Sequence, residues 1–223
     1  MKGGIACFMA ALSRINTESL NYSIGFLITA DEEGPSKDGT VKVVEELQKR
    51  NETVDYCLIG EPSTLETVGD NIRIGRRGSI NIELEVLGKQ GHAAYPARVD
   101  NPIHKVVPFL DKLLREVWDK GNEHFPPTSL QLTNISAGVG AHNVTPNNLY
   151  LKFNLRFSTE ISGETIQNKI RNFLDSEGIK HKVSFDINAQ PFYSKPKLFT
   201  DIVCKSIEEV QGFKTTLSCS GGT

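Results

Sequence analysis

Acidic residues follow two apolar segments of strand length, and they are the first candidates for chemistry. Asp31-Glu32-Glu33 comes directly after the apolar run 23–30, and Glu61 comes just after the apolar run 55–59. Ligands of open α/β sheets collect at the carboxyl ends of the strands, so acids at two such ends can converge on one cation. A solvated turn explains the same residues without a ligand. Zinc normally also requires histidine nitrogen, so these acids alone favour magnesium or calcium.

Several other side chains have a context that suits substrate binding. His92 lies between glycine and alanine, which leaves its imidazole free to donate a hydrogen bond to a reacting carbonyl. Arg156 lies on the polar side of an alternating segment, where it is either solvated or grips a carboxylate with two hydrogen bonds. Asn143 and Gly222-Thr223 belong to glycine-containing loops that can present an amide or backbone donors. Ordinary turns explain these loops equally well, and a surface position is the alternative for His92.

The first sixty residues show the pattern of an α/β fold. Helical spacing over 3–15 and 40–50 alternates with the apolar runs 23–30 and 55–59, which have the length of buried strands. Apolar strands alternating with helices indicate a mostly parallel sheet that helices flank. The helix over 3–15 is rich in small residues, so we expect it to be buried against this sheet.

The pattern then changes to the alternation of half-buried antiparallel strands. Apolar and polar residues alternate over 80–86, 149–157 and 183–187. Helices are expected over 102–118 and 163–176, and a glycine just after the second suits its C-terminal end. The resulting order of strand, helix, strand, strand, helix and strand predicts a small α+β sandwich.

This change of pattern predicts an insertion of one domain into another. We assign 78–190 to an inserted α+β sandwich, and 1–77 together with 191–223 to a partial α/β catalytic domain. A helix over 198–210 is expected to return the chain to the first domain.

The composition excludes some classes of partner. The chain has 223 residues, 23% of them charged, with a formal net charge of −2, which gives no electrostatic basis for binding nucleic acid or an anionic membrane. Its longest apolar run is too short to span a bilayer. Its four cysteines form no Cys-x-x-Cys pair, so reduced thiols in a cytoplasmic protein are expected rather than a disulfide framework.

Several segments in order resemble the M20 family of metallopeptidases and amidohydrolases over essentially the whole chain. The run 118–131 is similar in particular to members that act on a succinylated substrate. The other matching segments are Met1-Lys2-Gly3, Ala30-Asp31-Glu32-Glu33, Gly60-Glu61-Pro62-Ser63, Gly75-Arg76-Arg77-Gly78-Ser79, the run 90–96 and Asn101-Pro102-Ile103-His104-Lys105.

The resemblance implies an enzyme that hydrolyses an amide bond of N-succinyl-LL-2,6-diaminopimelate, with two Zn²⁺ ions and Co²⁺ as a possible substitute. It gives Glu32 the role of general base, and it makes Glu33 and Glu61 ligands of one metal each. It implies that His92 reaches across a homodimer, formed by the inserted domain, to stabilise the oxyanion. The positions that it matches to substrate contacts are Arg76, Ser79, Asn143, Arg156, Gly222 and Thr223.

The remaining metal ligands of the family have no counterpart in this sequence. The bridging aspartate would precede Met1, one histidine would lie further upstream, and another would follow Thr223. We therefore expect this chain alone to bind zinc weakly and to have little activity. Two alternatives stay open: a related M20 deacylase or aminopeptidase with another acyl specificity, and a non-catalytic dimerisation module.

Overall fold

The computed structural model describes residues 2–32, 34 and 36–220. The chain forms two compact units, residues 1–63 (unit 1) and residues 64–223 (unit 2), and each is described by itself. Within the described ranges, every helix is too short or too polar to traverse a lipid bilayer.

The described residues of unit 1 form two α-helices and one short 3₁₀ helix. The helix α1 spans Lys2–Leu12, η1 spans Thr17–Ser19 and α2 spans Thr40–Lys49. Both predicted helices are therefore confirmed. The expected burial of the first is wrong, because none of the described side chains of α1 is buried. The composition of α1 predicts that the helix prefers to be buried. Whether another element covers it depends on segments outside the helix, which its own residues do not specify.

The two strands predicted in unit 1 are wrong. The described part of this unit contains no strand, so neither apolar segment, 23–30 or 55–59, forms one there. All of their side chains except that of Thr29 are exposed, as the 68% exposure of Ile28 and the 70% exposure of Ile59 illustrate. An apolar run predicts burial, but a strand also requires a neighbour to pair its N–H and C=O groups. Neither segment forms a strand ladder among the described residues of unit 1.

Unit 2 is built around a four-stranded antiparallel sheet in the order β4-β6-β2-β7. Its strands are β2 (Gly78–Leu87), β4 (Ser129–Ala137), β6 (Asn148–Phe157) and β7 (His181–Ala189). The three alternating segments predicted from the sequence all lie in these strands. The observed order of strands and helices is also the predicted one.

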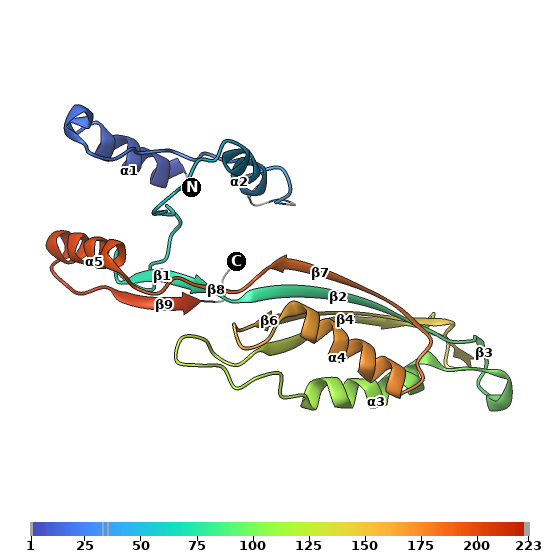
Figure 1. The fold of residues 1–223 in the computed structure, drawn as a ribbon. Helices are drawn as coiled ribbons and strands as arrows, with labels where there is room; N and C mark the ends of the chain where they lie inside the picture. The colour runs from blue at the N-terminus through green and yellow to red at the C-terminus, as the bar shows by residue number, and fades with distance from the viewer. Residues whose placement is uncertain (1, 33, 35, 221–223) are drawn as a thin grey trace. The chain divides into compact units, whose positions relative to one another are not determined.

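Two helices cover one face of this sheet (Figure 1). They are α3 (Pro102–Arg115) and α4 (Gly163–Ser176). The side chain of Ser162 caps α4 by accepting a hydrogen bond from the backbone N–H of Thr165. Gly178 has a φ of 61° just after α4, a conformation that favours glycine and ends the helix as predicted.

The core lies between these helices and the inner face of the sheet. Alternate residues of β2 and β6 point into it, and the apolar faces of α3 and α4 close it. Each fully buried side chain of this kind contributes about 1.5–3 kcal/mol. The largest fully buried side chains include Phe109, Leu113, Phe153, Phe157, Ile166 and Ile170.

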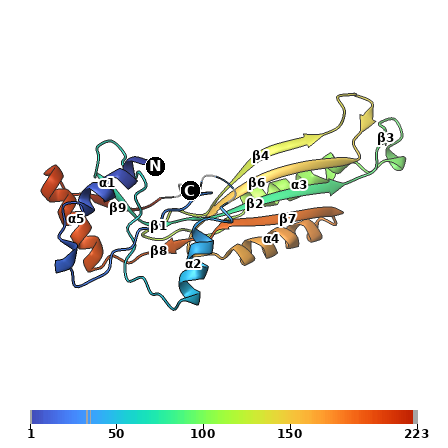
Figure 2. The same cartoon turned by 90° about the horizontal axis from the view of Figure 1, so that it is seen from above.

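A second, three-stranded sheet with the order β8-β1-β9 adjoins one end of the first. Its strands are β1 (Asn71–Arg76), β8 (Phe192–Tyr193) and β9 (Thr216–Ser220). The pairing of β1 with β9 is parallel, whereas that of β1 with β8 is antiparallel. The predicted C-terminal helix is confirmed as α5 (Leu198–Gln211), which leads from β8 to β9 (Figure 2).

Short connections join the two sheets. Only Arg77 separates β1 from β2, and Gln190-Pro191 separate β7 from β8. At the opposite end of the long sheet, β3 (Gly91–His92) pairs with β5 (Val144–Thr145). The 3₁₀ helix η2 (Pro96–Arg98) follows β3 in the chain. This small ladder and the three-stranded sheet therefore mark the two ends of the sandwich (Figures 1 and 2).

Candidate functional site

The acidic turn of unit 1 is organised by its first carboxylate. Asp31 adopts a left-handed conformation with a φ of 66°, which aspartate tolerates better than most residues. Its Oδ2 accepts hydrogen bonds from the backbone N–H groups of Lys37 at 2.9 Å and Asp38 at 3.3 Å. Backbone donors therefore satisfy the first acid of the run, and it does not require a cation.

The acids predicted to carry the metal chemistry of unit 1 do not form a complete metal site. Glu32 and Glu61 are exposed, and Glu33 lies outside the described residues. Among the residues that the structure describes, no three His, Cys, Asp or Glu side chains are grouped to hold an ion. The sequence of unit 1 also contains no histidine. Because zinc is normally held by nitrogen or sulfur as well as oxygen, these residues do not fit a zinc site.

His92 lies on the short ladder at the far end of the sandwich and is exposed. It is opposite Val144 in the pairing of β3 with β5. Its Nδ1 accepts a hydrogen bond from the backbone N–H of Ala94 at 3.1 Å. In a neutral imidazole the proton must then be on Nε2, which makes Nε2–H a donor. This tautomer is the one required to donate to a developing oxyanion.

Asn143 lies beside His92 on the same ladder. Its carbonyl oxygen accepts a hydrogen bond of 2.9 Å from the backbone N–H of Ala93. The hydroxyl of Thr145 donates to the carbonyl of Gly91 and accepts from its N–H, both at 3.1 Å. These contacts hold the two strands together. Two of the predicted site residues, His92 and Asn143, are thus brought together with both side chains exposed.

Ser79 and Arg156 lie at the other end of the sheet, near the three-stranded sheet. They are opposite each other across β2 and β6, and Ser79 is only 4% exposed. The side-chain amide of Asn154 donates to the hydroxyl oxygen of Ser79 at 3.2 Å. Because that contact uses Ser79 as an acceptor, its O–H is available as a donor. Arg156 is half-buried on the outer face of the sheet, as predicted.

Arg76 ends β1, three residues before Ser79, and is half-buried. Within the described chain, its Nε is shielded from solvent without a hydrogen-bond partner. The neighbouring Gly78 is required by packing, since a Cβ there would lie 2.3 Å from the ring of Phe157. The predicted contact residues Gly222 and Thr223 lie outside the described residues.

The predicted residues of unit 2 thus form two groups at opposite ends of one sheet (Figure 2). One group contains His92 and Asn143, and the other contains Ser79 and Arg156. Leu87 lies eight positions after Ser79 along β2, a distance of about 26 Å at ~3.3 Å per residue. One sandwich therefore cannot place both groups on the same small molecule.

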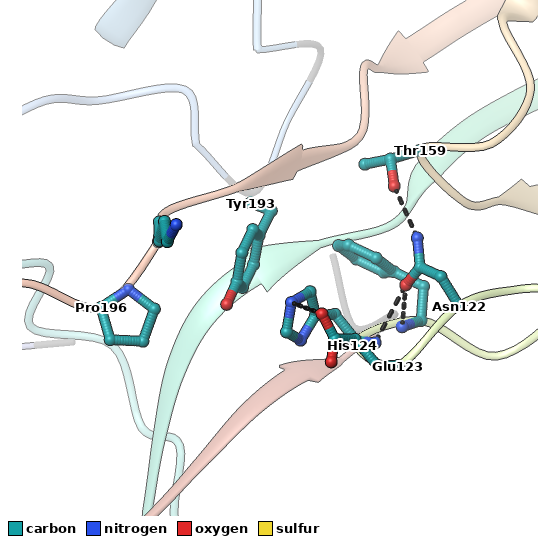
Figure 3. Close-up of a pocket in the computed structure, with 8 residues that line it drawn as sticks. Asn122, Glu123, His124, Thr159, Tyr193 and Pro196 are labelled. Carbon is teal, nitrogen blue, oxygen red and sulfur yellow. Dashed lines mark hydrogen bonds and ion pairs between the residues drawn. The ribbon is translucent and has the colours of Figure 1, made fainter.

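A groove of about 650 Å³ between the loop after α3 and β8 was not predicted from the sequence (Figure 3). The rings of His124 and Tyr193 are stacked there, with centroids 3.9 Å apart and planes inclined by 19°. His124 belongs to the segment 118–131 that carries the family resemblance, which was the available signal. The lining residues are Asn122, Glu123, His124, Phe125, Thr159, Tyr193, Lys195 and Pro196.

Asp119 organises the loop that carries this stack, and the sequence did not reveal it either. Its carboxylate accepts hydrogen bonds from the N–H of Gly121 at 2.7 Å, the N–H and hydroxyl of Thr128, and the hydroxyl of Ser158 at 2.9 Å. Burial by itself raises the pKa of the Asp119 carboxyl, but these hydrogen bonds outweigh it and lower the pKa. The ionised carboxylate therefore holds the loop in place.

Comparison with known proteins identifies the class. The peptidase dimerisation domain of the M20 family matches residues 74–182. The resemblance to the M20 family found in the motifs is confirmed. In particular, the chain is 48% identical over 225 residues to a succinyl-diaminopimelate desuccinylase of Hahella chejuensis. That alignment covers all of this chain, which spans 59% of the relative's length.

Solved structures support the fold. The dipeptidase Dug1p of Saccharomyces cerevisiae has a TM-score of 0.63 at 16% identity, over 85% of this chain and 53% of that one. An M20 family metallo-carboxypeptidase of Sulfolobus solfataricus has a TM-score of 0.58 at 13% identity, over 67% and 47% of the two chains. The predicted class, a mixed α/β chain with an α+β dimerisation domain, is confirmed. The domain boundaries stay a prediction.

Proposed function

We propose that this chain belongs to a zinc-dependent amide hydrolase. The reaction is the hydrolysis of N-succinyl-LL-2,6-diaminopimelate to succinate and LL-2,6-diaminopimelate, a step toward lysine and peptidoglycan precursors. The proposal rests on the 48% identity, in an alignment that covers all of the chain, to a relative named succinyl-diaminopimelate desuccinylase. We also propose that the enzyme acts in the cytoplasm, consistent with the free state of its four cysteines.

The side chains of this chain have complementary roles in that reaction. The Nε2–H of His92 donates to the carbonyl oxygen as negative charge develops on it. The exposed carboxylate of Glu32 accepts a proton from the attacking water and passes it to the leaving amine. Arg156, with Arg76 and Ser79 nearby in the fold, binds carboxylate groups of the substrate. Asn143, Gly222 and Thr223 are proposed as further substrate contacts.

Two zinc ions, or cobalt in their place, would supply Lewis-acid chemistry in the family. Glu33 and Glu61 are the proposed ligands from this chain. The described residues of unit 1 do not fit a complete site, so we derive no step through a metal. The 223-residue chain should therefore bind zinc weakly. Isothermal titration that found two tight zinc equivalents on it would contradict this expectation.

We propose a homodimer through the inserted domain, because His92 must reach a substrate held near Arg156 of another copy. Two surface features support this interface. The helix α3 exposes apolar side chains away from the core, including Val107 at 58% and Leu114 at 59%. The strand β4 lies at the edge of its sheet, where its outer N–H and C=O groups can pair with a second copy.

Hydrolysis is tested with N-succinyl and N-acetyl substrates, on this chain and on the complete gene product, with zinc supplied. We expect the complete product to release succinate far faster than acetate. Preference for the N-acetyl substrate would instead indicate a related M20 deacylase, and cleavage of peptides an aminopeptidase. A metal-free dimer without any hydrolase activity would indicate a dimerisation module.

Mixing two inactive variants tests whether the site is shared between copies. In an equal mixture of His92→Ala and Arg156→Ala chains, half of the dimers are mixed, and each contains one intact site. After the dimers of the mixture are dissociated and allowed to re-form, the mixture should recover about a quarter of wild-type activity. No recovery, with subunit exchange verified by sedimentation, would contradict a shared site.

A further inference from the structure

Two guanidinium groups share one end of the sandwich in unit 2. Arg77 forms the connection between β1 and β2, and its Nη1 lies 3.5 Å from the hydroxyl oxygen of Ser129. Ser129 is in turn opposite Arg156 across β4 and β6. Burial lowers the pKa of Arg77, and the positive charge of Arg156 lowers it further. The two cations are therefore close enough to repel each other.

No acidic side chain compensates this repulsion in the described part of the protein. Neither Arg77 nor Arg156 takes part in any of the ion pairs found there. The Nε of Arg77 is also buried without a hydrogen-bond partner among those residues. An unpaired donor and a like-charged neighbour both cost free energy, which an anion at this position would recover.

The surroundings favour a carboxylate as that anion. The hydroxyls of Ser79 and Ser129 are on either side of Arg156 in the strand pairing, so neutral donors accompany the two cations. Guanidinium groups match the planar carboxylate with paired hydrogen bonds. We propose that Arg77 acts together with Arg156 to bind a terminal carboxylate of the acyl group, and so selects dicarboxylic acyl chains such as succinyl. This inference rests on the proposed function and adds Arg77 as a specificity-determining residue.

Succinate binding to the 223-residue chain tests the site without requiring hydrolysis. Titration calorimetry at neutral pH and low salt compares the wild type with Arg77→Gln, and Arg73→Gln is the control because Arg73 is an exposed arginine of β1. Loss of one charged donor should weaken succinate binding about tenfold or more in Arg77→Gln. The Arg73→Gln chain should bind within about twofold of wild type, and neutral succinamide should not bind.

Two results would overturn the inference: absence of succinate binding to the wild type, or equal affinity in Arg77→Gln and wild type. Circular dichroism and the urea midpoint of each variant verify that it is folded. Weakening by added potassium chloride is expected as well, because salt screens the attraction between the arginines and the dianion.

Kinetics on the complete gene product separate this inference from the proposed function. The ratio of kcat/KM for the N-succinyl over the N-acetyl substrate should fall about tenfold in Arg77→Gln, mainly through KM. If no substrate is hydrolysed but succinate binding still depends on Arg77, the proposed function fails and the carboxylate site stands. If hydrolysis occurs and the ratio is unchanged, the site fails and the function stands.

Discussion

Replacing Asp119 by asparagine tests whether one ionised carboxylate holds the loop between α3 and β4. The Oδ2 of Asp119 accepts from the hydroxyls of Thr128 and Ser158, and these residues are 8% and 0% exposed. An asparagine presents an N–H₂ group to one side of this network. About two charge-assisted hydrogen bonds are then lost, in part compensated by rotation of the hydroxyls. We expect the free energy of unfolding to fall by about 2–3 kcal/mol.

Urea denaturation followed by circular dichroism measures this change, and the melting temperature should fall by roughly 5–10 °C. Asp111→Asn is the matched control. Its carboxylate pairs with Arg115 on the surface of α3, where the two side chains are 59% and 80% exposed. Removing an exposed pair should change the free energy of unfolding by less than about 0.5 kcal/mol.

The pH dependence gives a second test, because the folded protein lowers the pKa of Asp119. A carboxyl with a lowered folded-state pKa stabilises the fold fully above its unfolded-state pKa of about 4. That stabilisation is lost as the pH falls through the folded-state value. The difference between wild type and Asp119→Asn should therefore narrow between pH 7 and pH 3. A constant difference, or one no larger than that of Asp111→Asn, would refute the reasoning.

Three further substitutions probe the sandwich. Phe109→Ala should cost about 3–5 kcal/mol in urea unfolding, because its fully buried ring leaves a cavity. Gly178→Ala should cost about 1 kcal/mol in the same assay, since alanine is strained at a φ of 61°. Val107→Glu should shift sedimentation toward the monomer with little loss of stability, because this side chain is exposed on α3. A dimer unaffected by that charge would contradict the proposed interface.

The sequence predicted the sandwich well because one signal carried two kinds of information. Alternation over 149–157 identifies a strand and also states which side chains face the core. The apolar runs 23–30 and 55–59 carry only the first kind of signal, a preference for burial. Their burial and their backbone pairing depend on other segments of the chain. Both strand predictions were therefore wrong.

Candidate site residues could be predicted from the sequence where they belong to a short local motif. They could not be predicted where the fold brings hydrogen-bond donors together from distant segments. The short motif around Ser79 indicates that residue and Arg76 as candidates. It does not indicate Arg77, because the burial of Arg77 beside Arg156 arises only from strand pairing. Likewise, Asp119 is one acid among many until the fold brings Thr128 and Ser158 to it. The proton position on His92 also depends on a turn contact that no residue pattern specifies.

The short connections between the two sheets determine where a change in the angle between the sheets would occur. One residue, Arg77, leads into the sandwich from β1, and two residues, Gln190-Pro191, lead from it to β8. Any bending between the two sheets would therefore be concentrated at this end of the sandwich. The ladder that carries His92 lies at the other end of an arm roughly 30 Å long, so a rotation of ~10° at the connections displaces it by about 5 Å. A small torsional change beside the arginines would therefore become a larger displacement of the imidazole. A ligand that fixed the conformation of Arg77 would then also restrict the positions available to His92.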